Sequence, residues 1–171
     1  MSRVSPLQRN ANHFFLGYYL PGLKEEIWQF KDQSNPSIMR WTEKTVSLSA
    51  AIININYIVR ALGHAEFKAN LKSAPNALDH LGKKLAVSLD AEYAPHLLNK
   101  NRVLVKSAKC TRNERHTQVY KAYSINADEQ IIDLQQQPNF LIIDDVFTSG
   151  ATTDEITRAI RQVYKDAGVS V

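Results

Sequence analysis

One segment near the end of the chain constrains the fold more than any other. Residues 140–143 are an unbroken apolar run, as a strand buried on both faces requires, and Asp144 and Asp145 follow it directly. A loop of small residues then leads into a stretch with apolar side chains at helical spacing, namely Ile156, Ala159, Ile160, Val163 and Tyr164. A buried strand, a tight loop and an amphipathic helix form the repeating unit of α/β folds.

Helical spacing also dominates the first half of the chain. Apolar residues recur at intervals of three and four over residues 20–30 and 38–52, so residues 1–50 should form a largely helical amino-terminal part. Asn76 is suited to cap a third helix, whose apolar face is Leu78, Leu81, Leu85 and Leu89.

Strands are expected between these helices. The β-rich runs at residues 57–62 and 93–98 predict two strands, and Gly168 is expected to end the last helix. The alternation predicts a single domain over residues 1–171 with a Rossmann-like α/β fold, in which helices flank a mainly parallel sheet.

Composition narrows the class of protein. The chain has 171 residues, of which 44% are apolar and 22% charged, as in an ordinary globular domain. No apolar run approaches the roughly 18 residues of a membrane span, and the first residues lack the pattern of a signal peptide. Cys110 is the only cysteine, which excludes an internal disulfide and a multi-cysteine zinc site. We therefore expect a cytoplasmic protein without membrane contact.

Positive charge is concentrated in one polar stretch. Residues 99–117 show no periodicity and are expected to form a flexible basic loop. Between residues 100 and 115 the average composition gives about two cations, and the chain has six: Lys100, Arg102, Lys106, Lys109, Arg112 and Arg115. Such a loop favours an anionic partner, and a nucleic acid remains an alternative although no aromatic residue is interleaved to stack on bases.

The loop after the two acids suits a phosphorylated sugar. Its residues, Thr148, Ser149, Gly150, Ala151 and Thr152, offer backbone N–H groups and hydroxyls at the positive end of the following helix. Asp144 and Asp145 can accept hydrogen bonds from two adjacent ribose hydroxyls and contact a hard cation through water. Thr152 and Glu155 also match a capping box, so Thr152 is expected to begin the helix as well.

Three other kinds of site share parts of this pattern, and the residues exclude each of them. A P-loop needs a lysine after its last glycine, and a dehalogenase-type nucleophile needs two acids separated by one residue. A receiver domain needs more than the 26 residues that follow Asp145. An acidic turn before an ordinary capped helix, with no ligand, remains as an alternative.

The whole pattern closely resembles the phosphoribosyl pyrophosphate motif of the type I phosphoribosyltransferases. Four apolar residues, two aspartates, two apolar residues and Thr-Ser-Gly-Ala-Thr match it, although Phe147 and Ser149 replace a smaller aliphatic residue and a commoner threonine. The resemblance implies that Asp144 and Asp145 are catalytic and hold the ribose. It also implies that Mg²⁺ is bound near them through the ligand and water, without a direct protein ligand.

The resemblance extends to two further segments. Residues 57–64 look like the first strand and pyrophosphate loop of the family, which implies ligand contacts by Arg60, Ala61, Leu62, Gly63 and His64. The basic stretch at residues 99–117 would correspond to the mobile hood that closes over the site.

Over most of its length the chain is most similar to the ComF-type phosphoribosyltransferases, which are associated with DNA uptake. The helix ending in Lys31 and the polar cluster at residues 112–118 carry this likeness. The paired-cysteine zinc module of many ComF-type proteins is missing. The chain also ends shortly after Gly168, so we expect that either the last strand is very short or the chain is truncated.

The implied reaction is transfer of the phosphoribosyl group to a nitrogen nucleophile, usually a nucleobase, by an enzyme that is often a homodimer in this family. Two other hypotheses remain: a non-catalytic sensor of phosphoribosyl pyrophosphate or nucleotide, and a scaffold of the DNA-uptake machinery.

Overall fold

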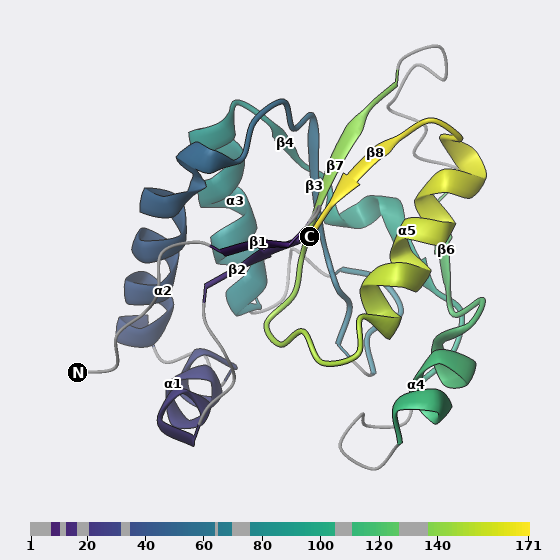
Figure 1. Cartoon of the computed structure of the whole chain (residues 1–171), viewed down its shortest axis with the longest axis horizontal. Coiled ribbons are helices and arrows are strands. Elements are labelled where there is room, and N and C mark those ends of the chain that lie inside the picture. Colours follow the sequence, from purple (N-terminus) through teal and green to yellow (C-terminus); the bar gives the residue numbers. More distant parts are fainter. Residues whose placement is uncertain are drawn as a thin grey trace.

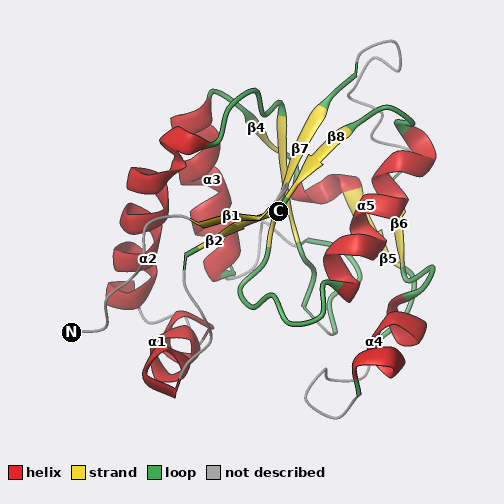
Figure 2. Cartoon of the chain, in the orientation of Figure 1, coloured by secondary structure: helices red, strands yellow, loops and turns green. Residues whose placement is uncertain are grey.

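The computed structural model describes residues 8–10, 13–16, 21–31, 35–63, 65–69, 76–104, 111–126 and 137–171. Its centre is a four-stranded parallel sheet in the order β4-β3-β7-β8 (Figure 1). These strands are β3 (Tyr57–Arg60), β4 (Glu92–Tyr93), β7 (Asn139–Ile143) and β8 (Gly168–Ser170). Helices lie on both sides of the sheet (Figure 2), so the α/β class and the parallel sheet are confirmed.

The connections leave the two central strands in opposite directions. Helix α3 (Ala77–Leu89) leads from β3 outward to β4, and α5 (Ala151–Val163) leads from β7 outward to β8. Arg60 pairs with Ile143, so β3 and β7 end at the same level. Ligands of open parallel sheets bind at such a switch point, beyond the carboxyl ends of the strands.

Both faces of the sheet are buried, which explains the continuous apolar strands. Ile58, Leu141 and Ile143 pack in one core with residues of α3 and of α2 (Asn35–Leu48). Val59, Phe140 and Ile142 face the other core, whose members on α5 are Ile156, Ala159 and Ile160. Neighbouring residues of one strand thus serve opposite cores, as the two-residue repeat of a strand requires.

The amino-terminal part is helical, as predicted, but it also contains a hairpin. Helices α1 (Pro21–Lys31) and α2 match the two predicted helices, and a short 3₁₀ turn, η1 (Ser49–Ala51), follows them. Before them, β1 (Gln8–Asn10) pairs antiparallel with β2 (His13–Phe15). This hairpin was not predicted from the sequence.

The cap of α3 is confirmed in detail. The Asn76 side chain accepts a hydrogen bond from the N–H of Leu78 at 3.0 Å, and the Asp79 carboxylate accepts one from the N–H of Asn76 at 3.0 Å. This reciprocal arrangement satisfies donors that a helix start leaves open. It also fixes Asp79 in the first turn of α3, where its carboxylate accepts a hydrogen bond from Arg60 at the end of β3.

Two expected boundaries are wrong. The strand predicted at residues 93–98 is divided by a 3₁₀ turn, η2 (Pro95–Leu97), because Pro95 has no N–H to continue a ladder. The chain then enters β5 (Leu98–Lys100), which pairs antiparallel with β6 (Tyr123–Ile125) in a separate sheet. Gly168 does not end the last helix, since it begins β8, where a Cβ would overlap the Asn139 side chain.

The described part of the basic stretch contains regular secondary structure, which its lack of periodicity did not predict. It begins within β5 and includes α4 (Arg112–Val119), whose start is capped reciprocally by Thr111 and Glu114. Residues 105–110, with Lys106 and Lys109, lie outside the described residues. Within the described ranges, no helix has the length and apolar character that crossing a membrane demands.

Candidate functional site

A cavity of about 430 Å³ lies at the carboxyl ends of β3 and β7. It brings together two loops that are about 80 residues apart in the sequence, residues 61–63 and residues 144–153. The described residues that line it are Lys31, Ala61, Leu62, Gly63, Asn76, Leu78, Leu104, Arg115, Gln118, Val119, Tyr123 and residues 144–153. The predicted site loops therefore share one cavity at the switch point of the sheet.

The two acids form a turn directly after β7. The N–H of Asp145 donates to Oδ1 of Asp144 at 2.8 Å. Burial and the neighbouring charge of Asp145 raise the pKa of Asp144 to about 7, although the N–H groups of Asp145 and Val146 and the charge of Lys31 act in the opposite direction. Asp144 thus titrates near neutral pH, which suits a group that must accept hydrogen bonds and exchange a proton.

Lys31 forms an ion pair with this turn. Its Nζ lies 3.0 Å from Oδ2 of Asp145, and the lysine side chain is 47% exposed. Because Lys31 is the last residue of α1, the ion pair ties the amino-terminal part to the acids of the site. In the sequence this lysine stood out only through the family likeness and was not predicted to belong to the site.

The small-residue loop starts α5 through a glycine rather than a threonine. Gly150 is the N-cap with a φ of 77°, in the left-handed region that glycine adopts without strain. The expected cap by Thr152 is wrong, since this residue already lies in the first helical turn. Glu155 does not reach back to it either, because its carboxylate accepts from Arg158 at 2.6 and 2.7 Å.

The consequence is that Thr152 faces the cavity without serving as a cap. Thr153, one residue on, donates its hydroxyl to the carbonyl of Gly150 at 2.9 Å, and the Ser149 hydroxyl accepts from the N–H of Ala151 at 3.4 Å. These bonds hold the loop over the first turn of α5, whose N–H groups and partial positive charge favour an anion.

The opposite loop is less open than the family resemblance implies. The N–H of Ala61 donates to the carbonyl of Ile143 at 3.0 Å, as a continuation of the sheet. The N–H of Gly63 donates to Oε2 of Glu66 at 2.5 Å. Two of the three backbone donors assigned to pyrophosphate are therefore engaged within the protein, although Ala61, Leu62 and Gly63 all line the cavity.

The guanidinium of Arg60 is directed into the protein interior. It is 0% exposed and is absent from the cavity lining. Its Nε donates to Asp79 at 2.6 Å, and both terminal nitrogens donate to Glu66 at 2.9 Å. A buried guanidinium needs such partners, so these acids explain why an arginine ends a core strand.

The predicted hood cations fall into separate groups. Lys100 is buried and donates to the carbonyl of Gly63, and burial lowers its pKa. Arg102 donates to the carbonyls of Gln118 and Tyr120 at 3.0 and 2.6 Å, which holds the end of α4. Arg115, on α4, lines the cavity.

Three hood cations and one loop residue cannot be placed by their side chains. Arg112 is the first residue of α4, where only the backbone is described, and Lys106, Lys109 and His64 lie outside the described residues.

A hard cation would find suitable ligands at the acidic turn. Asp144 and Asp145 present carboxylate oxygens to the cavity, and Mg²⁺ is commonly held by one or two carboxylates together with water and phosphate oxygens. Among the described residues, no cluster of three or more His, Cys, Asp or Glu could hold a metal ion by itself.

Comparisons of this chain with protein-family models, with curated proteins and with solved structures gave no match.

Several lining residues had no signal in the sequence. Leu104 and Tyr123 are ordinary apolar and aromatic residues, whereas Gln118 stood out only as part of the polar cluster that carries the family likeness. Only the topology brings them to the cavity, because β5 and β6 carry their neighbours past the end of the main sheet.

Proposed function

We propose that this protein binds phosphoribosyl pyrophosphate with Mg²⁺ and transfers the phosphoribosyl group to a nitrogen nucleophile, a nucleobase or a related ring. The observation that carries the proposal is the convergence of an acidic turn and a phosphate-type loop on one cavity at the switch point of a parallel sheet. The resemblance of residues 140–152 to the phosphoribosyl pyrophosphate motif supports the same conclusion.

The cavity offers a different chemistry to each part of the ligand. Residues 148–152 and the start of α5 suit the 5-phosphate, because they present N–H groups, hydroxyls and the positive end of a helix. Asp144 and Asp145 suit the ribose hydroxyls. Lys31 and Arg115 are the two cations among the described lining residues and suit the pyrophosphate.

The reaction needs little covalent chemistry from the protein. The acceptor nitrogen forms a bond to C1 of the ribose, while the bond from C1 to the pyrophosphate oxygen breaks and its electron pair leaves with pyrophosphate. Asp144 and Asp145 would stabilise the positive charge that develops on the ribose, and one carboxylate would take the proton from the acceptor nitrogen. When bound, Mg²⁺ supplies positive charge to the leaving group.

A second candidate function is a non-catalytic sensor of phosphoribosyl pyrophosphate or nucleotide. Its support is the internal use of three groups that the family resemblance assigned to pyrophosphate: Arg60, Lys100 and the N–H of Gly63. A protein that binds the sugar phosphate firmly and the leaving group weakly would report the ligand without cleaving it.

The two functions separate in one experiment. The protein is incubated with phosphoribosyl pyrophosphate, Mg²⁺ and a panel of nucleobases, and pyrophosphate release is measured, while calorimetry measures binding of phosphoribosyl pyrophosphate alone. Transfer predicts release with at least one base. Tight binding without release from any base favours the sensor.

The binding claim is tested by a double variant, Asp144→Asn with Asp145→Asn, which should lose calorimetric binding. Asp166→Asn is the matched control, because Asp166 is exposed in the turn before β8 and lies outside the cavity lining. An unchanged affinity in the folded double variant would overturn the proposal.

A further inference from the structure

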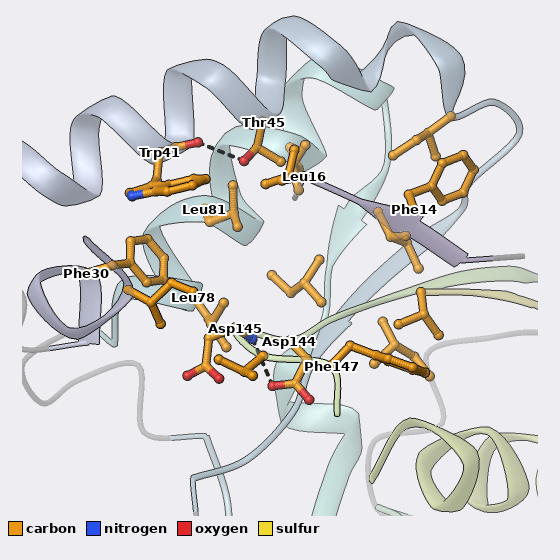
Figure 3. Close-up of a pocket in the computed structure, with 18 of the residues that line it drawn as sticks. Phe14, Leu16, Phe30, Trp41, Thr45, Leu78, Leu81, Asp144, Asp145 and Phe147 are labelled. Atoms are coloured by element: carbon orange, nitrogen blue, oxygen red, sulfur yellow. Dashed lines mark hydrogen bonds between the residues drawn. The ribbon is translucent and has the colours of Figure 1, made fainter. Parts of the chain in front are cut away.

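A second cavity of about 200 Å³ adjoins the acidic turn. In Figure 3 the turn with Asp144 and Asp145 closes one side of this cavity, and Trp41 and Thr45 of α2 lie across from it. Phe30 and Phe14 flank the space from the amino-terminal part of the chain. We call it the apolar cavity and the first one the polar cavity.

Most of the residues that line the apolar cavity are apolar. Apart from Thr45, Asp144 and Asp145, every described lining residue is apolar, and four of them are aromatic: Phe14, Phe30, Trp41 and Phe147. The Thr45 hydroxyl already donates to the carbonyl of Trp41 at 2.7 Å. The two carboxylates and the indole N–H of Trp41, which is buried without a hydrogen-bond partner among the described residues, are therefore the polar groups that these walls offer to a guest.

The charges of the two cavities differ in sign. The described lining of the apolar cavity contains no lysine or arginine, whereas Lys31 and Arg115 line the polar cavity. A negatively charged guest in the apolar cavity would be desolvated beside two acids, and Lys31, which pairs with Asp145 at 3.0 Å, is not part of the described lining, so binding of such a guest is unfavourable. A neutral guest with an N–H group could instead donate a hydrogen bond to Asp144 or Asp145.

The cavities adjoin along the acidic turn. Five residues line both of them: Leu78, Asp144, Asp145, Val146 and Phe147. A guest in the apolar cavity would thus meet the same carboxylates as a sugar in the polar cavity. Transfer requires the acceptor nitrogen to reach C1 of the ribose directly, so the two guests would have to meet along this shared boundary.

We infer that the apolar cavity binds the acceptor, and that the acceptor is a neutral, planar heteroaromatic ring without a carboxylate. The assignment as acceptor rests on the proposed function. The volume suits one ring or two fused rings rather than a nucleotide, and aromatic side chains on several sides favour a flat guest. The acids select a ring that carries an N–H and reject one that carries negative charge.

Trp41 provides a direct probe. The chain has two tryptophans, and Trp28 is 59% exposed on α1, so Trp28→Phe leaves the cavity tryptophan as the single fluorophore of its kind. This variant is titrated at pH 7.5 with nicotinamide and with nicotinate, two rings of nearly equal size that differ in charge. We expect saturable quenching by nicotinamide and an affinity at least tenfold weaker for nicotinate. Equal affinities, or quenching that rises linearly with nicotinamide as in random collisions, would overturn the inference.

Filling the cavity gives an independent test in the same background. Thr45→Phe places a ring in the apolar cavity and should abolish saturable quenching by nicotinamide, whereas Thr45→Val has nearly the size of threonine and should retain it. Calorimetric binding of ribose 5-phosphate should remain in both, which shows that they fold. Quenching that survives in folded Thr45→Phe overturns the inference, and if that variant does not fold, the charge selectivity above decides alone.

The experiments distinguish a failure of the acceptor assignment from a failure of the proposed function. If the unsubstituted protein binds ribose 5-phosphate but not nicotinamide, the apolar cavity is not the acceptor site and the proposed function is unaffected. If it binds nicotinamide selectively but neither ribose 5-phosphate nor phosphoribosyl pyrophosphate, the proposed function fails and the acceptor role fails with it. Tighter binding of nicotinamide in the presence of ribose 5-phosphate supports both.

Discussion

The carboxylate of Glu66 accepts a hydrogen bond from the backbone N–H of Gly63 at 2.5 Å and also forms an ion pair with the guanidinium of Arg60. A carboxylate between a loop N–H and a buried cation occupies the kind of position that a phosphate oxygen takes in an anion site. Lys100 contributes to the same cluster, since its charge and those hydrogen bonds offset the effect of burial and hold the pKa of Glu66 below its usual range.

Removal of this carboxylate should strengthen pyrophosphate binding. Glu66→Gln keeps the shape of the side chain and removes its charge, and Glu66→Ala also frees the N–H of Gly63. We expect calorimetry with pyrophosphate and Mg²⁺ to give an affinity about 3- to 10-fold higher for the alanine variant, which corresponds to about 0.7–1.4 kcal/mol. The glutamine variant should lie between it and the unsubstituted protein. Weaker binding in both variants would show that Glu66 only supports the loop.

Asp79 should be essential for stability. It is 1% exposed and accepts hydrogen bonds from Arg60 and from the Tyr93 hydroxyl, both at 2.6 Å. Asp79→Ala leaves a buried arginine with one partner fewer, and such losses typically cost about 3–5 kcal/mol. Urea denaturation followed by circular dichroism measures the change in the free energy of unfolding.

The control for this variant is the partly exposed ion pair of Glu26 and Arg40, whose side chains are 28% and 58% exposed and whose charged atoms lie 3.1 Å apart. Glu26→Ala should cost less than about 1 kcal/mol, because exposed ion pairs contribute little. If Asp79→Ala and Glu26→Ala lowered the free energy of unfolding equally, burial would not explain the role of Asp79.

Stability should fall as pH rises toward neutrality, because of Asp144. Its pKa of about 7 keeps the carboxyl protonated in the folded state at pH 5.5, where an unfolded aspartate has lost its proton. The folded state therefore binds more protons between about pH 4 and 7, and the free energy of unfolding decreases over that range and levels off above it.

Asp144→Asn should flatten this decline. We expect a melting temperature higher than that of the unsubstituted protein at pH 8 and nearly equal to it at about pH 4, where Asp144 is protonated in the folded state and largely protonated in the unfolded state, together with loss of sugar-phosphate binding. Asp166→Asn, at an exposed acid, should follow the unsubstituted protein at both pH values. If the melting temperatures of all three proteins changed by the same amount between the two pH values, the pKa of Asp144 would not be raised.

Gly150 should tolerate asparagine better than alanine. Its φ of 77° costs an ordinary side chain about 1–2 kcal/mol, and a Cβ would also lie 3.0 Å from the Phe147 ring. We expect Gly150→Ala to lower both the free energy of unfolding and the affinity for ribose 5-phosphate, with partial recovery in Gly150→Asn, since asparagine enters this region more readily. Equal effects of the two substitutions would point to the ring contact rather than to the backbone.

The sequence predicted those elements whose local pattern and burial agree. The strands around Val59 and Ile142 are apolar because both faces of the sheet are covered, and Asn76 caps α3 through a signal contained in four consecutive residues. The acidic turn and the glycine loop were also visible, since the motif is continuous along the chain.

The errors arise where distant residues decide the outcome. Helix α4 has a single buried apolar residue, Val119, so no periodicity indicated it, although Thr111 and Glu114 carried a capping signal. The buried acidic partners of Arg60 were not foreseen because they come from other segments, Asp79 lying 19 residues away. Thr152 was expected to be a cap because a left-handed Gly150 is not recognisable from sequence.

The pairing of β3 with β7 has a consequence for how the protein assembles. The two loops of the polar cavity belong to segments about 80 residues apart, and they meet only after this parallel pair has formed across a long intervening chain. Pairings of such high contact order form late and slowly. A ligand that touches both loops should therefore leave the refolding rate nearly unchanged and slow unfolding instead, so that its stabilising effect appears as a longer lifetime of the native state.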